Sequence, residues 1–391
     1  MSEHRIPVSH VGSLVRPSEF VALLEEKAAG RPVANFDAAL RSAVETVVRR
    51  QVQAGVDIVS DGEFGKGIGW EQYVLERLSG FSEEPPGDPA SGEPAVPRWG
   101  DFARFADFYR EAFGRDRYLE HPMPCTGPIR YTGIAPLQRD ISNLKAAAAN
   151  AGAYAAFLPL VAPASATALS ENRYYASDEE YIYAVAEALR VEYQTVLDAG
   201  LLVQIDDAHL PFMYDRMVPP GTDADYDRWA RLRIEALNHA LRGLDTSRVR
   251  YHICWGSWNG PHTRDVPLRR IVSLLLELNV GGYAIEAANA RHEHEWQVWK
   301  EVKLPEGRKL MPGVVSHQTN VVEHPELVAE RLERFASVVG RENVIAGTDC
   351  GFAQGPFVRR VHESIMWAKL ESLAQGAALA SSALWKRRSV A

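Results

Sequence analysis

LLVQIDDA at 201–208 and VRYHICWG at 249–256, separated by a helical pattern over 225–244, decide the fold. Each run is short and apolar and ends in polar residues, and the segment between them is long enough for a crossover between parallel strands. The alternation continues through GGYAIEAA at 281–288, KLMPGVVS at 309–316 and NVIAGTDCG at 343–351. Helical patterns lie between these runs, over 266–279 and 325–340. Repeated strand–helix units predict an α/β protein with a parallel sheet.

Three earlier runs bring the expected strands to eight: VSHVGS at 8–13, DIVSDGE at 57–63 and AAFLPLVAPAS at 155–165. Eight parallel strands favour a single (β/α)₈ TIM barrel, which we expect to form one catalytic domain over residues 1–391. An open doubly wound sheet is the alternative, but the first strand is not followed by a Gly-x-Gly-x-x-Gly turn. The Pro/Gly-rich segment 83–100 indicates a surface loop insertion, and Ser177 with Glu180 predicts a helix start.

Composition and charge exclude several classes of protein. The 391 residues are 46% hydrophobic and 24% charged, which is typical of a folded domain rather than a disordered chain. The net charge is −8 and the sequence has no basic run, so we expect no nucleic-acid partner. It has no 18-residue apolar stretch and no signal-peptide pattern at its start, which predicts a cytoplasmic protein without a membrane partner. The sequence leaves a homo-oligomer open.

Polar side chains cluster at the ends of the expected strands. Because the carboxyl ends of barrel strands converge on one rim, these residues predict an active site there. The residues are Ser13, Asp61, Glu63, Asp206, Asp207, His252, Cys254, Glu286, Ser316, His317, Asp349 and Cys350.

Four of these side chains have the chemistry of metal ligands. His252 and Cys254 lie two residues apart, so they share one face of a strand. With Glu286 and Cys350 they make a set of two sulfurs, one nitrogen and one oxygen, which suits Zn²⁺. The alternative to a metal site is a structural strand that carries a His and a small apolar Cys. Cys125 has no such partners and is expected to be structural.

Zinc held by two thiolates favours one kind of reaction. A substrate thiol bound there would lose its proton and stay nucleophilic, so the pattern predicts attack of sulfur on an alkyl carbon. A zinc hydrolase or lyase that activates water is the competing use of such a site, and a non-catalytic metal-binding barrel is a further alternative.

The ordered motifs resemble the catalytic C-terminal barrel of cobalamin-independent methionine synthase. The resemblance covers nearly the whole chain, and it implies that His252, Cys254, Glu286 and Cys350 bind zinc. It also implies that the positions of Ser13, Glu63 and Asp206 hold the amino acid part of homocysteine. The motifs are VGSLVRP at 11–17, SDGE at 60–63, TGPIRY at 126–131, VQIDDA at 203–208, HIC at 252–254, IEAANAR at 285–291, MPGVV at 311–315 and GTDCG at 347–351.

The chain departs from that family in several places. It has a single barrel, where full-length methionine synthases carry a second one that helps to bind the folate, so a folate donor is in doubt. Asp207-Ala208-His209 stands where those enzymes have Glu-Pro-Ala. His317 matches the family's histidine after a one-residue gap and is the candidate proton donor, with Glu286 as a ligand that the substrate displaces.

A helix-rich insert is expected at 255–267, longer than in methionine synthases. Its Trp255, Trp258, His262 and Arg264 would line a different substrate pocket.

Single-barrel relatives of methionine synthase include epoxyalkane:coenzyme M transferases, which need a cationic pocket for a sulfonate. Arg264, Arg291 and Lys66 are candidates for that charge, and Arg291 is the best placed because it closely follows Glu286. The sequence thus predicts a zinc-dependent thiol alkyltransferase that acts on a small-molecule thiol and an alkyl donor. The first expectation is methyl transfer to homocysteine or a related thiol, as in methionine biosynthesis, and the alternative is epoxide opening by coenzyme M.

Overall fold

The computed structural model describes residues 4–70, 72–82, 99–113, 123–168 and 170–386. In this part of the chain, seven parallel strands form one curled sheet in the order in which they occur along the sequence. The strands are β1 Ile58–Val59, β2 Ala155–Val161, β3 Leu202–Asp207, β4 Val249–Ile253, β5 Gly282–Ile285, β6 Lys309–Val315 and β7 Gly347–Thr348.

The segment expected as the first strand closes the ring between β7 and β1. Val8 makes a parallel bridge with Ala346. On its other side, the carbonyl oxygen of Val8 accepts hydrogen bonds from the N–H groups of Asp57 and Ile58 at 3.0 and 3.1 Å. The molecule therefore has the (β/α)₈ TIM-barrel-like fold that the sequence predicts, and the open doubly wound alternative was wrong.

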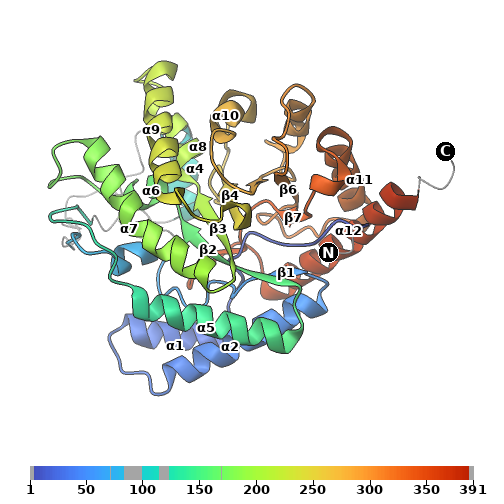
Figure 1. Cartoon of the computed structure of the whole chain (residues 1–391), viewed down its shortest axis with the longest axis horizontal. Coiled ribbons are helices and arrows are strands. Elements are labelled where there is room, and N and C mark those ends of the chain that lie inside the picture. Colours follow the sequence, from blue (N-terminus) through green and yellow to red (C-terminus); the bar gives the residue numbers. More distant parts are fainter. Residues whose placement is uncertain (1–3, 71, 83–98, 114–122, 169, 387–391) are drawn as a thin grey trace.

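Helices surround this sheet (Figure 1). Neighbouring helices pack in pairs, α2 on α5, α7 on α9 and α11 on α12. The longer helices are α1 Ser18–Ala28, α2 Phe36–Gln53, α5 Ile134–Ala151, α7 Asp178–Asp198, α8 His209–Met217, α9 Asp223–Leu241, α11 Pro325–Val339 and α12 Glu363–Lys386. Shorter ones are α3 Gly100–Arg104, α4 Ala106–Phe113, α6 Pro163–Thr167, α10 Leu268–Leu275 and the 3₁₀ turns η1 Gln72–Arg77, η3 Thr246–Arg248, η4 Glu293–Lys300 and η5 Arg341–Asn343.

Local sequence explains where these helices begin. The Ser177 side chain accepts a hydrogen bond from the Glu180 N–H at 3.1 Å, so it caps α7 as predicted. Thr222 and Asp225 form a reciprocal capping box at the start of α9. The strands between the helices are buried almost throughout, as expected of a parallel sheet covered by helices.

Two expectations about the connections need comment. The segment 255–267 is not helical: it runs as turns and extended chain, because Gly256, Gly260, Pro261 and Pro267 interrupt any helical pattern. The predicted loop at 83–100 lies outside the described residues except for positions 99 and 100. After β7, the short strands β8 Ala353–Gly355 and β9 Val358–Arg359 form an antiparallel hairpin.

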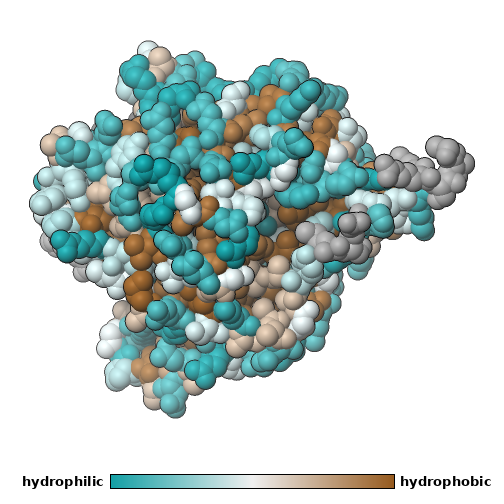
Figure 2. Space-filling model, viewed as in Figure 1, coloured by the Kyte–Doolittle hydropathy of each residue, from teal (hydrophilic) through white to brown (hydrophobic). Residues whose placement is uncertain are grey.

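Hydrophilic residues cover most of the face shown in Figure 2, with smaller apolar areas between them. Among the helices in the described part of the chain, none is both long and apolar enough to cross a membrane.

Candidate metal centre and cavity

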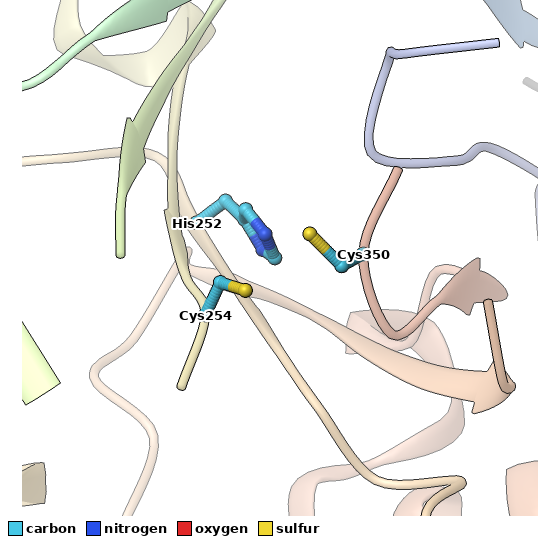
Figure 3. A group of neighbouring side chains, drawn as sticks. All are labelled: His252, Cys254 and Cys350. Atoms are coloured by element: carbon cyan, nitrogen blue, oxygen red, sulfur yellow. The ribbon is translucent and has the colours of Figure 1, made fainter. Parts of the chain in front are cut away.

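His252, Cys254 and Cys350 converge at the carboxyl end of the barrel (Figure 3). His252 is in β4, Cys254 directly follows that strand, and Cys350 is two residues beyond β7. One ligand atom from each, a ring nitrogen or Sγ, lies within 4.8 Å of the others. Period-2 alternation along β4 turns the first two side chains to the same side, and barrel closure brings the third.

The electrostatics of these side chains suit metal binding. Burial lowers the pKa of His252, so the imidazole is neutral, the form that binds metals. Neither of its ring nitrogens has a hydrogen-bond partner among the described residues. The hydrogen bond between the two thiols raises the pKa of Cys254 and lowers that of Cys350. A buried imidazole without partners beside two thiols is costly for an apo protein, and a metal ion would satisfy all three groups.

Glu286 lies beyond the end of β5, near this group but outside it. Its Oε1 accepts a hydrogen bond from the Trp255 N–H at 2.9 Å, and its Oε2 accepts one from Asn289 Nδ2 at 2.7 Å. Burial raises the pKa of Glu286. The Asp349 carboxylate ties this loop to the one that carries Cys350, because its Oδ1 accepts from the N–H groups of residues 287 and 288 at 2.7 and 2.8 Å.

A cavity of about 300 Å³ opens over the three-residue group. His252, Cys254 and Cys350 line it, and so do three further predicted residues, Ser13, Glu63 and Asp206. Asp206 pairs with His252 across β3 and β4, which places its carboxylate beside the imidazole. The structure thus brings these six residues together in one cavity, and Asp207 and Trp258, which the sequence also singled out, line it as well.

The carboxylates of the cavity differ in their surroundings. Glu63 Oε1 accepts a hydrogen bond from Lys66 Nζ at 2.5 Å, and both side chains are buried. Burial raises the pKa of Asp206 to about 7. The Ser13 hydroxyl donates to the carbonyl oxygen of Ala353, which fixes the N-terminal segment to the β8–β9 hairpin. Glu63 is therefore paired with a cation at hydrogen-bond distance, whereas Asp206 accepts a hydrogen bond from the neutral amide of Gln204 at 2.7 Å.

Other predicted residues lie outside the cavity lining. Arg291 is exposed and donates to the Thr263 carbonyl oxygen at 3.4 Å, because the chain turns outward after Asn289. Arg264 forms an ion pair with Asp215 at 2.6 Å. His317 is fully buried, and neither of its ring nitrogens makes a hydrogen bond within the described chain. Burial and the nearby Arg360 lower its pKa well below the usual value.

Two features of the cavity were missed from the sequence. Arg360, just after β9, lines the cavity, and aromatic side chains do so as well, among them Trp70, Phe102, Phe212 and Trp258. Trp258 was singled out within the 255–267 segment, but Phe102 and Phe212 belong to helices outside the strand ends. The sequence contains one indication of Arg360: it follows Cys350 by ten residues, in the segment after the last expected barrel strand. Cys125, expected to be structural, is fully buried.

Chemically, two sulfurs and one imidazole within 4.8 Å of one another are a donor set that could hold a metal ion, and all three side chains line the cavity. Three protein ligands, with a further position left for water or substrate, are typical of catalytic rather than structural zinc sites.

Known proteins of one family resemble this chain. The family described as "Cobalamin-independent synthase, Catalytic domain" matches residues 126–366, more than half of the chain. The methionine synthase of Thermococcus kodakarensis is 22% identical over 373 residues, which cover 95% of this chain and 92% of that protein. The 2-hydroxypropyl-CoM lyase of Xanthobacter autotrophicus is 22% identical over 417 residues, covering 99% and 98%. A B12-independent methionine synthase from Shewanella sp. W3-18-1, solved with selenomethionine, has the same fold, with a TM-score of 0.73 at 20% identity and coverage of 98% and 99%.

Proposed function

Because this chain belongs to the family of the cobalamin-independent synthase catalytic domain, we propose that it is a zinc-dependent transferase that alkylates a substrate thiol. The family is one of methionine synthase-type transferases. The first candidate reaction is methyl transfer to homocysteine or a related small thiol in the cytoplasm, by a catalytic domain that spans the chain. The observation that carries the proposal is the group His252, Cys254 and Cys350 at the floor of the cavity.

These three residues would hold the zinc, with Glu286 as a further ligand that the thiol replaces. Bound zinc would lower the pKa of an incoming thiol while leaving its sulfur nucleophilic. The fit rests on the donor set and on the unpartnered buried imidazole of His252.

The remaining cavity residues would orient the thiol-bearing molecule. Asp206 faces the cavity without a cationic partner as close as the one that Glu63 has in Lys66, so it suits a substrate ammonium group. Ser13 and Glu63 line the same cavity. His317 stays a proposed proton donor and Arg291 a proposed substrate contact, but neither lines the cavity, and burial lowers the pKa of His317 well below its usual value.

The reaction is a displacement at carbon. The thiol sulfur forms a bond to the donor's alkyl carbon, and the bond from that carbon to the leaving group breaks with its electron pair going to the leaving group. The thiol proton passes to solvent. No redox step is involved.

Epoxide opening by coenzyme M is the second candidate, and the cation that lines the cavity favours it. Arg360 stands there in place of the three predicted cations, and its guanidinium suits a sulfonate. The relative named 2-hydroxypropyl-CoM lyase aligns over 99% of this chain.

Zinc content tests the proposed ligands. We expect the wild type to bind about one zinc tightly, and Cys254→Ala and Cys350→Ala to lose tight binding. Cys125→Ala is the matched control, because Cys125 is also buried and free but lies outside the group. Full zinc occupancy in Cys350→Ala would show that Cys350 is not a zinc ligand.

The reaction is tested separately: the protein is incubated with homocysteine and candidate methyl donors, and the formation of methionine is measured by mass spectrometry.

A further inference from the structure

Three aromatic rings from separate segments form a wall on one side of the cavity. Phe102 comes from α3, Phe212 from α8 and Trp258 from the loop after β4. The centroids of the Trp258 and Phe212 rings are 5.1 Å apart, and those of Trp258 and Phe102 are 5.6 Å apart. The rings of Phe212 and Trp258 are only partly buried by the protein, so apolar ring surface is left beside the metal-binding group.

The position of the Trp258 ring is closely determined by its own loop. A Cβ atom at Gly256 would lie 1.8 Å from Cζ3 of the indole, and one at Gly260 would lie 2.4 Å from its Nε1. The two glycines therefore allow the loop to fold directly over the ring. The indole N–H donates to the Tyr109 hydroxyl at 3.1 Å, which fixes its rotation.

A chain of polar side chains packs against the ring: His262, His292 and Glu295 are buried and Asp265 is half-buried. The imidazole of His262 stacks on the Trp258 ring with centroids 4.5 Å apart. Asp265 lies 3.2 Å from His262 Nδ1 and 3.2 Å from His292 Nε2, and Glu295 lies 2.8 Å from His292 Nδ1. Burial opposes the charged form of His292, but its bonds to the two carboxylates outweigh this and raise its pKa to about 10.

We propose that Trp258 selects the alkyl donor, and that His262, Asp265, His292 and Glu295 act as positioning residues that hold its ring. The inference rests on the proposed function, because it assigns the donor to the apolar half of the cavity. The alkyl donor would then be a small molecule whose transferred or adjoining group is uncharged and apolar. Two observations set this limit: the wall offers ring surface, and a volume of about 300 Å³ is at the small end of ligand cavities.

Binding of an unreactive probe tests the wall separately from catalysis. Ligand-observed NMR would measure the dissociation constants of benzyl alcohol and of benzoate with the metal-free protein. We expect benzyl alcohol to bind more tightly than benzoate, and Trp258→Ala to weaken benzyl alcohol about tenfold, while Trp258→Phe weakens it much less. Trp296→Phe is the control, because Trp296 lies in η4 and does not line the cavity.

His262→Ala tests the positioning chain. We expect the dissociation constant of benzyl alcohol to rise about threefold with thiol-induced proton release unchanged, because the loosened ring still leaves the His252, Cys254 and Cys350 group intact. Equal binding of benzyl alcohol to wild type and to folded Trp258→Phe and Trp258→Ala proteins would overturn the inference. Failure of thiol proton release in the wild type would instead contradict the proposed function, so the two failures are distinguishable.

Discussion

Removal of the positive charge beside Glu63 should destabilise the protein far more than removal of a surface charge. Lys66 Nζ donates to Glu63 Oε1 at 2.5 Å and to the Pro159 carbonyl oxygen at 3.0 Å. The two charged side chains are only 8% and 4% exposed. Lys66→Met therefore leaves a buried carboxylate without its partner, which costs about 3–5 kcal/mol of unfolding free energy.

Urea unfolding followed by circular dichroism measures this loss. Arg31→Met is the matched control: it breaks an ion pair with Glu26 whose side chains are 57% and 49% exposed, and we expect no measurable change. The double variant Glu63→Gln with Lys66→Met should recover most of the stability, because it no longer buries an unpaired charge. A Lys66→Met protein as stable as the Arg31→Met control would refute the reasoning.

Three further predictions concern other parts of the site. The pKa of His292 is about 10 in the folded protein and about 6.5 in the unfolded chain. Its contribution to the free energy of unfolding is therefore complete below about pH 6.5 and is lost as the pH rises through about 10. The urea midpoint should fall with rising pH over this range in the wild type, and it should fall less in His292→Gln. Gly256→Ala should lower the melting temperature more than Gly307→Ala. Both glycines have positive φ, but only at Gly256 would the new Cβ meet the Trp258 ring, which adds about 1–3 kcal/mol to the loss of unfolding free energy. Equal losses in the two variants would mean that the ring moves freely. Asp349→Ala should weaken zinc binding about tenfold or more in competition with a chromophoric chelator, and unchanged affinity would show that its bonds to the β5 loop do not position the ligands.

The grouping of His252, Cys254 and Cys350 was predictable because two simple rules position these side chains. Alternation along β4 places His252 and Cys254 on one side, and the convergence of strand ends brings Cys350 and Asp206 to them. These rules depend on the regular backbone of strands and on barrel closure. They held even at β7, which ends two residues before Cys350.

Beyond the strand ends the sequence was a weaker guide, because loop backbone has no fixed period. Arg291 is only five residues past Glu286, yet the chain has turned outward there. Arg264 carries the charge expected of a ligand contact but is held by Asp215 of α8, a contact that sequence spacing does not reveal. The direction of the Trp258 ring depends on close packing against two glycines, which is a property of the folded loop.

The proposed function requires that the group of His252, Cys254 and Cys350 binds zinc and that the zinc activates a thiol. Calorimetric titration of the zinc-loaded protein with homocysteine and with coenzyme M, in buffers of different ionisation enthalpy, measures the protons released per thiol bound. We expect saturable release of about one proton when homocysteine binds to the zinc-loaded protein, and no release from the zinc-free protein. Proton release with coenzyme M alone would favour the second candidate reaction, the opening of an epoxide. If neither thiol released a proton on binding, the proposal that zinc at this site activates a thiol would be contradicted.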